Sequence, residues 1–146
     1  MRKLWMRWVI QIVLALTTPL VFAQGPVVQV YKTPSCGCCG DWVQHLKAAG
    51  FAVQVQDLED LAATKARLGV PADLQSCHSA VVQGHVIEGH VPASDIRRLL
   101  EEHPDGGGLA VPGMPLGSPG MEYGNRKDPY RVILFDGKKR SVFASH

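Results

Sequence analysis

Three of the four cysteines in this 146-residue chain lie within four consecutive positions. Cys36, Cys38 and Cys39 share the run Cys36-Gly37-Cys38-Cys39, so the first and the last form a C-x-x-C pair. Cys77 comes 38 positions after Cys39. A disulfide between such close neighbours closes almost no loop and adds little stability. The spacing therefore favours chemistry at the sulfur atoms over a structural cross-link.

The elements around this thiol loop indicate what kind of chemistry it supports. Residues 27–31 are apolar and β-branched, which predicts a buried strand. Residues 41–49 have helical spacing, and Gly50 is a natural helix end. A cysteine between such a strand and helix meets unpaired backbone N–H groups and the positive end of the helix dipole, which favour thiolate over thiol. Thiolate attacks disulfides and binds soft metals, so the position of Cys36 predicts reactivity without choosing between these uses.

The other patterns complete a βαβαββα order. They predict strands at 51–55, 80–82 and 85–87 and helices at 61–68 and 92–102. This alternation, with C-x-x-C between the first strand and the first helix, predicts an α/β fold of the thioredoxin-like class, with a mixed sheet flanked by helices.

The remainder of the chain has a different composition. Residues 111–121 form a Gly/Pro-rich loop, and residues 131–135 and 141–143 flank an Asp-Gly turn, which predicts a C-terminal β-hairpin. We expect one thioredoxin-like metal-binding domain over 24–146, with its core in 24–102 and with 103–146, the loop and the hairpin, packed on that core.

Residues 1–23 have the pattern of a cleaved secretory signal peptide. Three basic residues precede an apolar run over 8–16, and Val21-Phe22-Ala23 is a small-residue cleavage pattern. This apolar run is short for a membrane-spanning helix, which needs roughly 20 residues. We therefore expect cleavage after Ala23 and a periplasmic protein with no stable membrane insertion.

The charge balance argues against binding of nucleic acid. The full chain carries 15 basic and 13 acidic residues, but Arg2, Lys3 and Arg7 belong to the predicted signal. The remainder has 12 basic residues against 13 acidic ones. A general nucleic-acid binder would show a clustered basic face instead.

The predicted topology brings the four cysteines together. Cys77 and His78 directly precede the third strand, and in a thioredoxin-like fold this segment abuts the start of the first helix. Four converging thiolates favour Cu(I), zinc or an iron–sulfur cluster. Zinc usually takes two separated cysteine pairs, whereas three sulfurs in one turn suit bridging thiolates and more than one Cu(I). We therefore favour a copper site formed by Cys36, Cys38, Cys39 and Cys77.

Two other uses of the same thiols stay open. Cys36 and Cys39 form a candidate redox pair, so a periplasmic thiol–disulfide oxidoreductase is the main alternative to copper binding. A structural zinc domain is the other. The sequence does not decide whether the protein is an enzyme.

Further candidate copper ligands lie outside the cysteines. Met114 and Met121 stand in the Gly/Pro-rich loop without helical periodicity, and a thioether is a soft ligand for Cu(I); filling gaps in the core is the alternative. His78 is adjacent to Cys77. His90 precedes the third helix, where a hydrogen bond to the backbone is the alternative to ligation.

Four runs, in order, carry a resemblance to a known family. They are residues 33–39 (TPSCGCC), 76–80 (SCHSA), 88–92 (EGHVP) and 113–122 (GMPLGSPGME). In these runs the chain resembles the exported CopG-like copper-resistance proteins, a family formerly described only as a domain of unknown function. The resemblance implies a thioredoxin-like fold, copper binding by the C-x-C-C cysteines and the later cysteine, and periplasmic copper tolerance. It leaves open storage, transfer to other periplasmic copper-handling proteins, and interconversion of Cu(I) and Cu(II).

Overall fold

The computed structural model describes residues 25–102 and 107–146. The elements, in chain order, are β1 (Val27–Lys32), α1 (Gly37–Ala48), β2 (Ala52–Asp57), α2 (Ala62–Arg67), the 3₁₀ turn η1 (Ala72–Leu74), β3 (Ser79–Val82), β4 (His85–Glu88), α3 (Ala93–Glu102), β5 (Gly108–Ala110), β6 (Arg131–Asp136) and β7 (Lys139–Ser145). The predicted βαβαββα order is confirmed up to α3. The predicted signal peptide, 1–23, lies outside the described residues.

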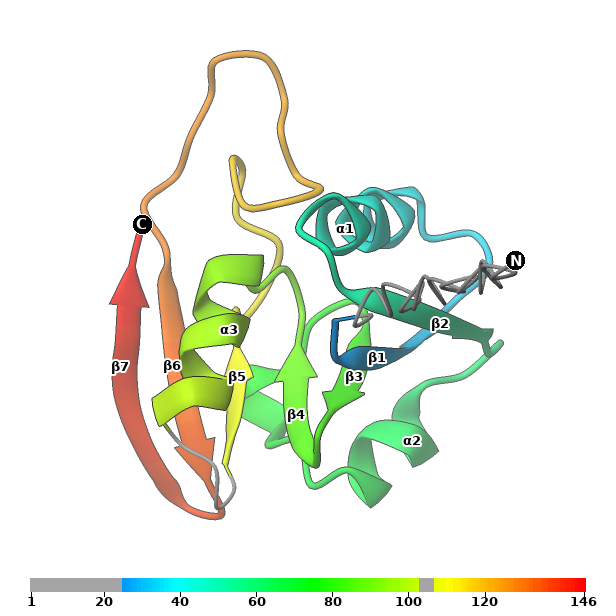
Figure 1. Ribbon diagram of the computed structural model, residues 1–146, viewed down its shortest axis with the longest axis vertical. Helices are drawn as coiled ribbons and strands as arrows, with labels where there is room; N and C mark the ends of the chain where they lie inside the picture. The colour runs from blue at the N-terminus through cyan, green and yellow to red at the C-terminus, as the bar shows by residue number, and fades with distance from the viewer. Residues whose placement is uncertain (1–24, 103–106) are drawn as a thin grey trace, which may run out of the picture.

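All seven described strands belong to one mixed sheet. Their order is β2-β1-β3-β4-β5-β6-β7, so that β2 and β7 are the two edge strands (Figure 1). The pairs β1/β2 and β4/β5 are parallel, and the other neighbours are antiparallel. The predicted fold class, a mixed sheet flanked by helices with a Gly/Pro-rich loop and a C-terminal hairpin, is confirmed.

The C-terminal part of the chain extends the sheet. The sequence predicted no strand between α3 and the terminal hairpin, yet β5 inserts between β4 and β6. β5 is only three residues long and begins with glycine, so its pattern is too short to recognise. The glycine is required there, since a Cβ on Gly108 would lie 2.5 Å from the carbonyl oxygen of Val86. The described segment from residue 107 onward therefore shares the sheet of the core.

Helix α1 begins earlier than the sequence predicted. It starts at Gly37, with Cys36 as its N-cap residue, whereas the pattern indicated a start at Asp41. Gly37 and Gly40 have low helix propensity, so the sequence pattern does not predict helix in this first turn. Burial of Trp42, a fully enclosed side chain, anchors the turn that follows. As a result, Cys38 and Cys39 lie in the first turn of a helix.

The two faces of the sheet carry different partners. Val28 and Val30 belong to the main apolar cluster, which also contains side chains of α1 and α3. Leu74 of η1 packs with Ala110 and Phe135 in a second cluster. Helix α2 precedes η1 and lies apart from α1 and α3 (Figure 1).

Residues 25–102 and 107–146 include no helix with the length and apolar character needed to cross a membrane.

Candidate metal centre

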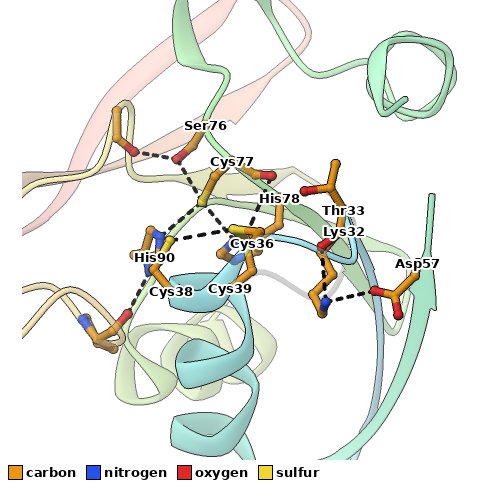
Figure 2. The surroundings of a disulfide bond; sticks show 12 residues. Lys32, Thr33, Cys36, Cys38, Cys39, Asp57, Ser76, Cys77, His78 and His90 are labelled. Atoms are coloured by element: carbon orange, nitrogen blue, oxygen red, sulfur yellow. Dashed lines mark hydrogen bonds and ion pairs between the residues drawn. A yellow bond between two sulfur atoms is a disulfide. The ribbon is translucent and has the colours of Figure 1, made fainter. Parts of the chain in front are cut away.

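Antiparallel pairing of β1 with β3 brings the cysteines together. Tyr31 pairs with Ser79, so the end of β1 lies beside the start of β3. The chain continues from β1 into the thiol loop, and Cys77 lies two residues before Ser79. The four cysteine sulfurs all lie within 4.8 Å of one another (Figure 2). The predicted convergence of Cys77 on the C-x-C-C run is confirmed.

Two of these sulfurs form a disulfide. Cys36, the N-cap residue of α1, is bonded to Cys39, which is fully buried. Cys38 and Cys77 are free and partly exposed. The Sγ atoms of Cys36 and Cys38 are 3.6 Å apart. The site therefore combines an oxidised C-x-x-C pair with two free thiols in contact distance of it.

Two histidines face the sulfur of Cys77. Its Sγ lies 3.2 Å from Nδ1 of His78 and 3.0 Å from Nε2 of His90 (Figure 2). The ligand atoms of these three residues form a second group, within 4.8 Å, which shares Cys77 with the four-cysteine group. The structure thus brings both predicted histidines to the site, although their role as ligands remains a prediction.

The backbone determines the orientation and tautomer of His90. Its Nδ1 lies 2.8 Å from the carbonyl oxygen of Pro119, which can only accept a hydrogen bond. Nδ1 therefore carries the proton, and in the neutral ring Nε2 presents a lone pair to Cys77. Burial lowers the pKa of His90, which favours this neutral ring. A second ring nitrogen bonded to a carbonyl is the usual arrangement of a metal-binding histidine.

His78 is enclosed by aromatic rings. It is fully buried, with its ring centroid 4.3 Å from that of Trp42 and 5.0 Å from that of His90. Burial, then the neighbouring His90 and the charge of Lys65, hold the pKa of His78 well below its usual value. Its Nε2 has no hydrogen-bond partner within the described part of the chain. The sulfur and neutral imidazole donors that face one another here fit a soft metal such as Cu(I).

The thiol of Cys77 is held in its protonated form. Burial, and the neighbouring Cys38, raise the pKa of Cys77 to about 11. The S–H of Cys77 can therefore donate to the lone pair of His90 Nε2. A metal ion that binds this sulfur must displace the proton, as thiolate ligation requires.

The Gly/Pro-rich loop reaches the site through its backbone. Ser76 Oγ, next to Cys77, donates a hydrogen bond to the carbonyl of Gly113, and Pro119 holds His90. In Figure 1 this loop, drawn in yellow and orange, comes close to α1 before it turns toward β6. Met114 and Met121 follow Gly113 and Gly120; Met114 is half exposed and Met121 is partly buried. Their thioethers stay predicted ligands.

Sequence reasoning missed a buried polar cluster behind Cys77. Lys65, Ser79 and Glu88 are almost fully enclosed and bonded to one another. One signal was present, because Glu88 ends an apolar strand and pairs in register with Ser79. Nothing in the local pattern indicated that Lys65, on a short helix, would be the counter-charge.

The contact between the loop and α1 gives a testable prediction. Gly120 has φ +85, and a Cβ there would lie 2.7 Å from the Cys38 carbonyl oxygen and 2.8 Å from the Trp42 amide nitrogen. Gly124 also has positive φ, +58, but has open space around it. We expect Gly120→Ala to lower the free energy of unfolding by about 2–4 kcal/mol and Gly124→Ala by only about 1 kcal/mol. Urea unfolding of the metal-free protein measures both, and equal losses would contradict this packing.

Comparison with known proteins agrees with this geometry. A family model described as "Protein of unknown function, DUF411" matches residues 74–121, which contain Cys77, His78 and His90. No curated protein sequence matches the chain. The solved structure "Copper resistance protein copG- Form 2" has 46% identity and a TM-score of 0.79, covering 84% of this chain and 98% of its own. "Copper resistance protein copG- Form 1" has 48% identity and a TM-score of 0.78, covering 82% and 96%. Since identity at this level extends over nearly the whole of both solved chains, this chain belongs to the CopG copper-resistance family.

Proposed function

We propose that this protein binds copper in the periplasm and contributes to copper resistance. Its reduced form holds Cu(I) through the thiolates of Cys36, Cys38, Cys39 and Cys77. The observation that carries the proposal is the approach of all four sulfurs to within 4.8 Å of one another. The names of the two similar solved structures support copper as the metal.

The arrangement of donors favours copper over zinc. Structural zinc sites place four ligands tetrahedrally around one ion, usually from two separated pairs. Here three sulfurs come from one helical turn and the fourth belongs also to a group with two imidazoles. A thiolate shared by two groups can bridge two ions, so the site suits more than one Cu(I). His78 and His90 are the nearest additional donors, and Met114 and Met121 are further candidate ligands on the loop.

The disulfide gives the proposed site two chemical states. Two electrons and two protons convert the Cys36–Cys39 disulfide to two thiols, which lose their protons when they bind Cu(I). Oxidation of the two thiols by a disulfide or another two-electron acceptor removes two of the four sulfur ligands and releases copper. Copper binding in this proposal therefore depends on the redox state of the C-x-x-C pair.

Copper titration tests the four-cysteine site. We expect anaerobically reduced protein to bind Cu(I) and Cys77→Ser to lower both the bound copper per protein and the affinity, the latter by about tenfold or more, because the bridging sulfur is lost. Ser35→Ala is the matched control, since Ser35 is exposed beside the thiol loop. Competition with a chromophoric Cu(I) chelator gives the affinity. Full copper uptake by Cys77→Ser, or equal uptake by protein with the disulfide intact, would refute the site as proposed.

Export is tested on the full-length chain. We expect expression in a bacterium with a periplasm to yield a mature protein that begins at Gln24, because the pattern at Val21-Phe22-Ala23 suits signal peptidase. Intact-mass measurement on the periplasmic fraction identifies the N-terminus. Ala23→Arg should block cleavage after residue 23. Unprocessed wild-type protein in the cytoplasm would show that the assignment is wrong.

One observation favours a second candidate function. The Cys36–Cys39 disulfide spans the N-terminus of α1, where a redox-active C-x-x-C pair of a thiol–disulfide oxidoreductase would lie. Attack by a substrate thiolate on one of these sulfurs would form a mixed disulfide and release the other as thiolate. A second substrate thiolate then attacks the mixed disulfide, so that the substrate is oxidised and the C-x-x-C pair reduced.

Insulin reduction by metal-free protein separates the two candidates. In this assay the reduced C-x-x-C pair transfers two electrons to an insulin disulfide, and dithiothreitol regenerates the reduced pair. If the protein is a thiol–disulfide oxidoreductase, the turnover rates of Cys38→Ser and Cys77→Ser should lie within about twofold of the wild-type rate, since these thiols take no part in exchange. It would lose activity with Cys36→Ser. We expect only background reduction by all four proteins, because the additional thiols belong to a metal site. Robust turnover that depends on Cys36 alone would favour the oxidoreductase.

A further inference from the structure

A buried ion pair lies directly behind the segment that carries Cys77. Lys65 of α2 has 5% of its surface exposed and Glu88, the last residue of β4, has none. The ammonium of Lys65 contacts Glu88 Oε1. Removing two charges from water is costly, and an apolar pair of similar volume often serves stability as well or better. The pair therefore calls for an explanation beyond folding.

The carboxylate of Glu88 binds both ends of the Ser76–Ser79 segment. Its Oε1 accepts a hydrogen bond from the backbone N–H of Ser76, at 2.7 Å, and its Oε2 accepts one from the hydroxyl of Ser79. Lys65 completes the cluster by donating to Ser79 Oγ at 3.0 Å. One side chain thus holds the residues immediately before Cys77 and immediately after His78.

The backbone of Cys77 and His78 has few hydrogen bonds of its own. β3 begins only at Ser79, so the two residues lie outside the strand. The carbonyl of His78 accepts one backbone hydrogen bond, from Gly89, at 3.0 Å. The hydroxyl of Ser76 donates to the carbonyl of Gly113, which holds the Ser76 flank alone. Among these contacts, only Glu88 holds both flanks of the segment.

We propose that Lys65 and Glu88 are positioning residues that hold Cys77 and His78 in place for copper. The proposal rests on the function proposed above and extends it to two residues that are not candidate ligands. A carboxylate suits the task because its two oxygens accept several hydrogen bonds at once and charge-assisted bonds are the stronger ones. Lys65 supplies the compensating charge that lets the carboxylate remain buried.

Two charge-neutral double variants separate positioning from charge. Lys65→Met with Glu88→Gln removes both charges but keeps an amide oxygen that can accept from Ser76 N–H. Lys65→Met with Glu88→Met removes both charges and every acceptor, with a side chain of similar length. Neither variant leaves an unpaired buried charge, the usual cause of failure to fold in a single substitution.

The first measurement needs no copper. In a Cys38→Ser background with the Cys36–Cys39 disulfide intact, Cys77 is the one free thiol of the chain. We expect its alkylation by iodoacetamide to be about tenfold faster in the Glu88→Met double variant, because the segment that carries Cys77 then opens locally more often. In the Glu88→Gln double variant we expect a rate within about threefold of the parent. Far-UV circular dichroism and thermal unfolding establish that each protein is folded.

The second measurement uses Cu(I) itself, on reduced protein that retains Cys38. Loss of the groups that orient a ligand typically weakens metal affinity by about 10–100-fold. We expect a loss in that range for the Glu88→Met double variant and recovery to within about threefold in the Glu88→Gln variant. Ser79→Ala removes one of the two hydrogen bonds to Glu88 and leaves the ion pair. Its Cu(I) affinity should lie between those of the two double variants, and it replaces them as the test if both fail to fold.

The outcomes decide the proposal separately from copper binding. Alkylation rates that stay at the parent value in the Glu88→Met variant, with only the unfolding temperature lowered, would show that the pair serves stability alone. Equal effects in the Glu88→Gln and Glu88→Met variants would show that charge matters and the attachments do not; both results overturn the proposal. If the wild-type protein binds no Cu(I), the proposed function fails, whereas the alkylation series still tests the positioning of Cys77.

Discussion

The antiparallel pairing of β1 with β3 is the constraint on which the site depends. Val28 pairs with Val82 and Val30 with Ala80, and all four side chains are buried on the face covered by α1 and α3. Because side chains alternate along a strand, a slip by one residue would turn these apolar side chains to the other face. Core packing thus fixes the register, and the register sets Cys77 opposite the first turn of α1. The sulfur cluster is a consequence of apolar burial at a distance from it.

The candidate site around this point combines two environments. Cys36, Cys38 and Cys77 are partly exposed, whereas Cys39 is buried. The imidazoles of His78 and His90 are buried, and their lowered pKa values favour the neutral, lone-pair form. A thiol whose pKa is raised by burial, as for Cys77, holds its proton until a metal displaces it. Burial thus keeps the two imidazoles and the Cys77 thiol uncharged in the metal-free protein. Neutral imidazole has a lone pair that can bind an ion.

Sequence patterns predicted the parts of this structure that depend on local periodicity. The strands, helices and terminal hairpin follow from apolar spacing, and the approach of Cys77 follows from the topology they imply. The start of α1 and the strand β5 escaped prediction because glycine dominates both, so tertiary packing decides them over local propensity. The hydrogen bond from His90 to Pro119, like the ion pair of Lys65 and Glu88, joins residues 29 and 23 positions apart. No local pattern records such contacts. Ligation by Met114 and Met121 stays a prediction.

The two sides of the site differ in how they are held. Cys38 and Cys39 lie on a helix whose next turn is anchored by Trp42, fully buried, with its indole N–H 2.9 Å from the Val91 carbonyl. Cys77 lies on a connection between η1 and β3, where neither helix nor strand fixes the backbone. Ordering such a segment costs conformational entropy that must be offset by specific bonds. Hydrogen bonds to Glu88 and to Gly113 supply them. Polar contacts therefore stabilise the segment that carries Cys77, whereas apolar packing stabilises the helix that carries Cys38 and Cys39. A buried ion pair is therefore consistent with a cysteine cluster that spans a helix and a loop.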